Sequence, residues 1–175
     1  FAGQAESCLC VRSVLHILGA IKQVWQSTFS PSAMIYLKTK GIPLNQVRMA
    51  VVVQEMIPAK ISGVMFTANV VNNNIKEMLV NATWGCGEAL VSGKIIPDTF
   101  ILQKSPLSIL QKDLGQKQFM CVPSYIDGNV QTALEETPQN KRESYSLDDY
   151  TLFEIGQLGL NIERDMGGPQ DVEWC

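Results

Sequence analysis

The chain has 175 residues, of which 46% are hydrophobic and 18% charged, and its formal net charge is −3. These values indicate a globular protein with a hydrophobic core, built as one domain or as two small lobes. Scattered lysines and arginines argue against a nucleic-acid partner, and no apolar run reaches the ~18 residues of a membrane-spanning helix.

Apolar residues at spacings of three and four predict an amphipathic helix over residues 8 to 29. They are Val11, Val14, Leu15, Leu18, Ile21, Trp25 and Phe29. His16 lies off this stripe, and we expect it to be solvated rather than catalytic. Ser30 as an N-cap and Pro31 in the first turn predict a second, short helix, followed by a loop.

Four segments then have the composition of short β-strands. They are residues 48–57 (RMAVVVQEMI), 62–69 (SGVMFTAN), 77–84 (EMLVNATW) and 98–105 (DTFILQKS). The asparagines between the second and third segments suit a hairpin turn, and residues 87–98 are long enough for about two helical turns. Strands that follow one another at this spacing predict an antiparallel sheet.

The polar stretch 135–146 is expected to be a mobile surface loop. Ser146, with Asp149 three residues on, predicts a helix start, and apolar or small residues then repeat at spacings of three and four. Gly167 to Pro169 end this helix, and residues 170–174 (QDVEW) are expected to form a returning strand. Helices, several strands, a helix and a strand together favour the α+β class.

Asp171 and Glu173 are the first candidate functional residues. Positions i and i+2 of a strand point to the same face, so both carboxylates would project side by side. Like charges at this spacing repel unless a cation lies between them, and Mg²⁺ binds carboxylate oxygens together with substrate phosphates. The alternative is a solvated strand face that carries an accidental Asp-x-Glu pair.

Two further segments have the composition of a nucleotide site. Gly85 and Gly87 permit backbone conformations that expose N–H groups to a phosphate or a ribose hydroxyl, with Glu88 as a polar contact; a simple turn is the alternative. Residues 54–56, Gln54, Glu55 and Met56, follow an apolar run and can line an adenine ring. The alternative for them is the ordinary end of a core strand.

Five segments in order resemble the nucleotide-binding domain of the phosphoenolpyruvate synthase and pyruvate phosphate dikinase family, which includes the rifampicin phosphotransferases. They are "FAGQ", "AVVVQEMIPAKISGVMFTAN", "ATWGCGEALVSGKIIPDTFIL", "QKDLGQK" and "PQDVEW". The resemblance implies an ATP-grasp fold. Residues 1–48 would be the helical part of its first lobe with a remnant of the phosphate loop, and residues 49–175 mainly its second lobe.

The resemblance also implies roles for single residues. Gly3 and Gln4 would cover the triphosphate, Gln54, Glu55 and Met56 would contact adenine, and Gly85, Gly87 and Glu88 would lie near the ribose or phosphates. Asp171 and Glu173 would bind Mg²⁺ as the cofactor of ATP. No residue of the chain is expected to act as a catalytic group. The partners implied are ATP and the phosphohistidine and acceptor-binding domains of the same enzyme.

The sequence departs from the family's pattern in several places. Ala5, Glu6 and Ser7 replace the usual Gln, Asp and Thr, and Cys86 replaces leucine. The family's phosphate-binding lysine and arginine precede "FAGQ", and its Gln-x-Arg element follows the Asp-x-Glu strand. We therefore expect a piece of a larger phosphotransferase that is inactive alone, with a preference for the phosphoenolpyruvate synthase-like members. The alternative is a non-catalytic nucleotide-binding or interaction module.

The five cysteines, at positions 8, 10, 86, 121 and 175, occur with a single histidine. This set is a poor match to the usual four-ligand zinc sites. We expect reduced thiols in a cytoplasmic protein, and a metal or redox pair at Cys8 and Cys10 is the alternative. No signal-peptide pattern is visible, and a start without methionine is compatible with a natural N-terminus further upstream.

Overall fold

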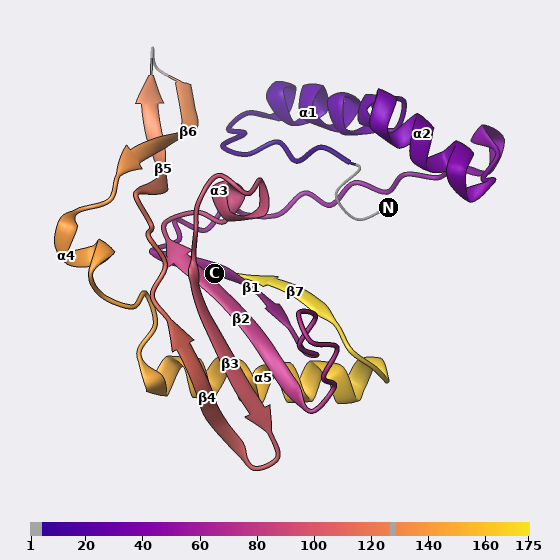
Figure 1. Cartoon of the computed structure of the whole chain (residues 1–175). Coiled ribbons are helices and arrows are strands. Elements are labelled where there is room, and N and C mark those ends of the chain that lie inside the picture. The colour runs from indigo at the N-terminus through magenta and orange to yellow at the C-terminus, as the bar shows by residue number, and fades with distance from the viewer. Residues whose placement is uncertain (1–4, 127–128) are drawn as a thin grey trace. The chain divides into compact units, whose positions relative to one another are not determined.

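The computed structural model describes residues 5–126 and 129–175 (Figure 1). The chain divides into two compact units, one formed by residues 1–56 and 125–131, the other by residues 57–124 and 132–175. The expected lobe boundary after residue 48 lies close to residue 56, where the first segment of the first unit ends. The assignment of the two lobes stays a prediction. Among the described residues, no helix is long and apolar enough to cross a membrane.

The second unit contains a five-stranded sheet. Its strands are β1 (Ile61–Phe66), β2 (Glu77–Trp84), β3 (Asp98–Lys104), β4 (Leu107–Asp113) and β7 (Asp171–Trp174). They lie in the order β4-β3-β2-β1-β7, and every neighbouring pair is antiparallel. The α+β class and the antiparallel sheet are thus confirmed. β5 (Phe119–Ile126) and β6 (Asn129–Glu136) form a separate two-stranded sheet.

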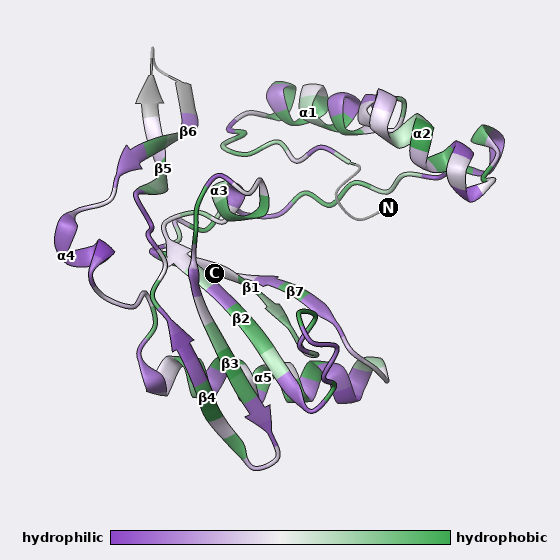
Figure 2. Cartoon of the chain, in the orientation of Figure 1, coloured by the Kyte–Doolittle hydropathy of each residue, from purple (hydrophilic) through white to green (hydrophobic). Residues whose placement is uncertain are grey.

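Helix α5 (Asp149–Met166) crosses one face of the large sheet (Figure 1). Gly159 permits the close approach, since a Cβ there would lie 2.6 Å from the sulfur of Met65. Hydrophobic stretches follow the central strands in Figure 2. The buried core of this unit consists of Met65, Met78, Val80, Ala82, Phe100, Leu102, Leu147 and Leu152. Removing these side chains from water supplies most of the unit's stability.

The first unit contains helices α1 (Val14–Ser27) and α2 (Pro31–Lys40), followed by a short 3₁₀ turn, Leu44–Gln46. The helix expected from residue 8 begins only at Val14, because the Ser13 hydroxyl caps it by accepting a hydrogen bond from the N–H of His16. Ser30 caps α2 as expected, and Gly41, at φ +65°, ends it. The apolar stripe of α1 is exposed: Val14 and Leu15 are 74% and 80% accessible.

The prediction of a strand over residues 48–57 is wrong. Residues 47–60 form neither helix nor strand, and Val52 is 81% accessible. A β-branched composition favours extended backbone, but a strand also needs a neighbour for its N–H and C=O groups. No strand in the described part of the chain pairs with this segment.

The stretch 135–146, expected to be a mobile surface loop, contains regular secondary structure and is partly buried. It contains the end of β6 and a one-turn helix α4 (Gln139–Arg142), and Thr137 and Ser146 are buried within it. Ser146 is not the cap of α5: its N–H and hydroxyl both donate to Asp98, and the cap is Asp148, which accepts from the N–H of Thr151. Buried polar partners far along the chain therefore order this segment.

Two other elements differ from expectation. Helix α3 (Glu88–Val91) has a single turn rather than two, because Lys94 donates its N–H to Ala89 and closes the chain after Gly93, whose φ is +70°. Strands β4 to β6 were not predicted from the sequence, and β5 contains a proline, Pro123, which usually argues against a strand. The strand expected at the C-terminal end is confirmed as β7.

Candidate functional site

Asp171 and Glu173 project from the same face of β7. Both residues are exposed, whereas Val172 between them and Trp174 after them are half-buried. In the antiparallel register, Asp171 lies opposite Phe66 and Glu173 lies opposite Val64 of β1. Residues paired across strands share a face, so both carboxylates lie on the side of the sheet away from the core, as the sequence predicted.

Contacts on the opposite face hold β7 in this orientation. The indole ring of Trp174 lies over Gly63, where a Cβ would come within 2.2 Å of its atoms. Before the strand, the N–H of Thr67 donates to the carbonyl of Gln170 at 2.9 Å, and the N–H of Gln170 donates to the Thr67 hydroxyl at 2.7 Å. A one-residue slip would turn both acids into the core, and these contacts oppose it.

The pair has no cationic partner in the described structure: no ion pair to Lys, Arg or His is formed by Asp171 or Glu173. No cluster of three or more His, Cys, Asp or Glu side chains that could hold a metal occurs in the same residues. The two carboxylates therefore offer an incomplete oxygen set. A Mg²⁺ ion bound there would take its other ligands from water, from a substrate phosphate or from a neutral oxygen.

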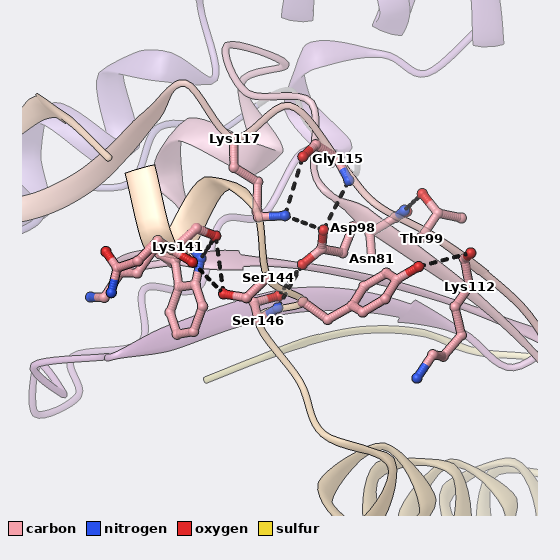
Figure 3. A network of polar contacts seen from close by, with 12 residues as sticks. Asn81, Asp98, Thr99, Lys112, Gly115, Lys117, Lys141, Ser144 and Ser146 are labelled. Atoms are coloured by element: carbon pink, nitrogen blue, oxygen red, sulfur yellow. Dashed lines mark hydrogen bonds and ion pairs between the residues drawn. The ribbon is translucent and has the colours of Figure 1, made fainter. Parts of the chain in front are cut away.

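The face of the sheet away from the core continues from these acids as a row of side chains. Glu173 lies opposite Val64, Val64 opposite Asn81, and Asn81 opposite Thr99. The Asn81 amide donates from Nδ2 to the Thr99 hydroxyl at 2.9 Å (Figure 3). Asn81 was not a candidate from the sequence, although a polar residue between Val80 and Ala82 in a predicted strand was a signal that it faces away from the core.

Gly85 is required by the backbone path. Its φ is +82°, and a Cβ there would lie 2.1 Å from the carbonyl oxygen of Cys121. Its N–H donates to the carbonyl of Lys60, and the N–H of Cys86 donates to that of Cys121. Both N–H groups are thus engaged within the chain. Gly87, with φ −70°, precedes α3, and a Cβ there would make only ordinary contact with Ser62. Nucleotide contacts at Gly85 and Gly87 stay predictions.

Glu88 is exposed and held at one oxygen. Thr132 of β6 donates its hydroxyl to Oε2 at 2.5 Å, while Oε1 accepts no hydrogen bond from the residues that the structure describes. Both side chains line a small cavity of about 70 Å³, together with Lys94 and Cys121. Burial, and then the neighbouring Cys86 and Glu88, raise the pKa of Cys121 to about 11. This thiol is therefore protonated at neutral pH and is not a nucleophile.

The remaining candidates lie in the first unit. Gln54 and Glu55 are exposed in the extended segment, and Met56 is half-buried. The Cys10 thiol lies 3.5 Å from the Met56 sulfur, and Cys8, Cys10 and His16 line a cavity of about 420 Å³. Gly3 and Gln4 lie outside the described residues. The structure thus places Asp171 and Glu173 on the same face of one strand. Gln54, Glu55 and Met56 lie in a segment that is neither helix nor strand, and the structure does not bring them together on one face.

A buried ionic network is the largest polar feature that the sequence did not reveal. The carboxylate of Asp98 is fully buried and forms an ion pair with the fully buried ammonium of Lys117. It also accepts from the N–H of Gly115 at 2.9 Å, and from the N–H and hydroxyl of Ser146 at 2.7 Å each (Figure 3). The network joins the start of β3 to two distant loops, so its role is structural.

Comparison with known proteins agrees with the resemblance drawn from the sequence. A family model described as "Pyruvate phosphate dikinase, AMP/ATP-binding domain" matches residues 1–175, the whole chain. The chain belongs to this family.

Individual relatives of this dikinase-family chain are similar along its full length. It is 36% identical over 175 residues to a probable phosphoenolpyruvate synthase of Methanocaldococcus jannaschii. It is 37% identical over 178 residues to the phosphoenolpyruvate synthase of Pyrococcus furiosus, and 35% identical over 175 residues to a rifampicin phosphotransferase of Bacillus subtilis. In each case the match covers 100% of this chain.

The dikinase-family chain is much shorter than these relatives. It spans 14% of the Methanocaldococcus protein, 22% of the Pyrococcus protein and 20% of the Bacillus protein. It therefore corresponds to only the nucleotide-binding portion of such enzymes, and most of each relative lies outside the match.

Proposed function

We propose that the chain is part of an ATP-grasp nucleotide-binding domain that binds Mg–ATP within a phosphoenolpyruvate synthase-like phosphotransferase. The parent enzyme transfers phosphate from ATP, through a phosphohistidine on another domain, to pyruvate or a similar small acceptor. The observation that carries this proposal is the family match over the whole chain. The outward-facing acid pair on β7 supports its metal-binding part.

The donor set at β7 fits a magnesium ion. Mg²⁺ is bound in many phosphoryl-transfer enzymes by one or two carboxylates, with phosphate oxygens and water completing an octahedron. Asp171 and Glu173 supply two carboxylates on one exposed face, with no cation of the described chain competing for them. When bound there, the ion supplies positive charge that offsets the negative charge of the phosphates.

The chain's own contribution is orientation. β7 is fixed through Trp174 and Gln170, so both exposed carboxylates already point away from the core before any ligand arrives. Groups that are ordered in advance lose little conformational freedom on binding. Phosphoryl transfer depends mainly on positioning and on neutralisation of the phosphate charge, and the two acids with their metal ion would contribute to both.

Other residues would bind the nucleoside. Glu88, with Oε1 available and Oε2 held by Thr132, is suited to accept a hydrogen bond from a ribose hydroxyl. The exposed segment with Gln54, Glu55 and Met56 offers backbone groups for the adenine edge. The glycines Gly3, Gly85 and Gly87 and the side chain of Gln4 would contact the phosphates. These roles rest on the resemblance to the family's motifs.

Calorimetric titration of the 175-residue chain with ATP, with and without Mg²⁺, tests this proposal. We expect binding that weakens at least tenfold when EDTA removes the metal. Asp171→Ala with Glu173→Ala should abolish the metal dependence and leave the far-ultraviolet circular dichroism unchanged, because both side chains are exposed. As a matched control, Asp165→Ala with Glu154→Ala removes two exposed acids of α5 and should change nothing.

Three results would contradict parts of this account. Unfolding of the Asp171→Ala, Glu173→Ala variant would show that the acids are structural. Metal-independent ATP binding would remove the magnesium role but keep a nucleotide-binding module. Absence of ATP binding at millimolar nucleotide, by a folded chain, would contradict nucleotide binding by this chain and favour a non-catalytic interaction module.

A further inference from the structure

Asn81 lies on the face of the sheet away from the core, in the same cross-strand row as Glu173. Val64 separates them, so the two Cα atoms are two strand spacings apart, about 9.6 Å. Both side chains rise from the same face, and the apolar Val64 between them carries no group that competes for a polar ligand. A hydrated ion beside Glu173 would therefore lie within reach of the Asn81 amide.

The Asn81 amide has a defined orientation. Its Nδ2 donates to the hydroxyl of Thr99 on β3, at 2.9 Å (Figure 3). Since the oxygen and nitrogen diverge from one carbon, Oδ1 cannot face the same hydroxyl. Oδ1 has no hydrogen-bond partner among the residues that the structure describes, although the side chain is half-buried. A neutral oxygen acceptor is thus held unpaired on the face that carries the acids.

A neutral oxygen is the type of group that the acid pair lacks. Mg²⁺ takes carboxylate and amide oxygens, and it retains several of its own water molecules, because it loses them reluctantly. Those waters are polarised by the ion and are strong hydrogen-bond donors. An amide oxygen accepts such a bond without adding negative charge near the phosphates of a nucleotide, whereas a third carboxylate would add it.

We propose that Oδ1 of Asn81 accepts a hydrogen bond from water bound to the metal ion that Asp171 and Glu173 hold with the phosphates of ATP. Asn81 is then the third protein oxygen of the site, and Thr99 is a positioning residue that fixes the amide. This inference rests on the proposed function. Its alternative is a purely structural cross-strand pair between Asn81 and Thr99.

The affinity of the chain for a metal ion in the presence of ATP distinguishes the proposed role of Asn81 from a purely structural one. The probe is Mn²⁺, titrated into the chain at saturating ATP, with free Mn²⁺ measured by electron paramagnetic resonance. Asn81→Leu has nearly the same shape but no oxygen, and should raise the Kd for Mn²⁺ by roughly fivefold to tenfold, the effect of one hydrogen bond. Asn81→Asp keeps an oxygen at this position and should bind Mn²⁺ at least as tightly as the unmodified chain.

Two further variants sharpen the test. Thr99→Val leaves the amide in place but frees it to rotate, so the Kd should rise only about twofold to threefold. Gln103→Leu makes the matched amide-to-leucine change on the same face, about 13 Å along the sheet from the Asn81–Thr99 row, and should have no effect. ATP binding in EDTA should be equal in the three uncharged variants, Asn81→Leu, Thr99→Val and Gln103→Leu, because Asn81 acts through the metal.

The inference is overturned if Asn81→Leu binds Mn²⁺ within twofold of the unmodified chain while Asp171→Ala with Glu173→Ala loses it; the proposed function then survives. It is also overturned if Asn81→Asp weakens Mn²⁺ binding as much as Asn81→Leu. Should Asn81→Leu unfold, Asn81→Ala takes its place with the same expected loss. If the folded, unmodified chain binds no Mn²⁺ with ATP, both the proposed metal site and this inference fail.

Discussion

The two units of the chain differ in how far their apolar side chains are buried. In the second unit, α5 and the sheet enclose a core in which Met78, Val80 and Leu152 are completely inaccessible. In the first unit, α1 has an equally regular apolar stripe, yet Leu15 and Leu18 are 80% and 52% accessible. Periodicity therefore predicts that a helix forms and which face is apolar, but it does not supply the surface that covers that face.

The ionic network of the second unit should give the largest effect. Lys117→Met leaves the buried carboxylate of Asp98 without its cation, and we expect the free energy of unfolding to fall by about 3–5 kcal/mol. Urea denaturation followed by circular dichroism measures it. Lys112→Met, which removes the partly exposed pair with Asp149, is the control and should cost less than about 1 kcal/mol. Equal effects would show that the buried network is unimportant.

A leucine exchanged for alanine in each unit tests the comparison directly. Leu152 of α5 is 0% accessible, and Leu152→Ala should destabilise the chain by about 2–5 kcal/mol through the cavity it leaves. Leu15 of α1 is 80% accessible, and Leu15→Ala should change the unfolding free energy by less than about 0.5 kcal/mol. Both are measured by urea denaturation. A large loss from Leu15→Ala would mean that the stripe is covered in solution.

The smallest effect concerns the turn between β1 and β2 and depends on pH. The amides of Asn69, Asn72 and Asn74 donate to the Glu77 carboxylate. The hydrogen bond from Asn69, followed by that from Asn72, holds the pKa of Glu77 below its usual value of 4.5. A lowered pKa in the folded state stabilises the fold above the unfolded-state value, and this contribution is lost as the pH falls through the folded value.

Glu77→Gln should therefore be less stable than the unmodified chain at pH 7, and the difference should shrink once the pH falls below 4.5. The measurement is the midpoint of urea denaturation at several pH values between 7 and 3. Asn73, in the same turn, donates none of these bonds to Glu77, so Asn73→Ser serves as the comparison for changes in the turn itself. A difference that stays constant with pH would contradict the role given to the carboxylate.

The sequence predicted local features well where neighbouring residues decide them. The cap at Ser30, the end of α5 at Gly167 and the strand with Asp171 and Glu173 all follow from local propensity and capping, and the structure has them. The predicted strand at residues 48–57 failed because a strand depends on a partner that composition does not reveal. The burial of Asp98 and Lys117 depends on a contact between distant segments, which no local pattern indicates.

Some features of the candidate site could likewise be predicted from the sequence, and others could not. The outward direction of Asp171 and Glu173 follows from strand alternation, so the sequence sufficed for it. The place of Asn81 depends on the register of three strands, and that register is visible only in the assembled sheet. The engagement of the Gly85 and Cys86 N–H groups likewise depends on Lys60 and Cys121, which are distant in the chain.

The stacking of Trp174 on Gly63 gives the chain an intrinsic optical probe. Its indole shares a four-residue strand with both acids but lies on the other face, so it senses movement of β7 without touching a ligand. The other two tryptophans are Trp25 in α1 and Trp84 at the end of β2. Replacing both by phenylalanine leaves a single fluorophore whose emission reports on the strand that carries Asp171 and Glu173.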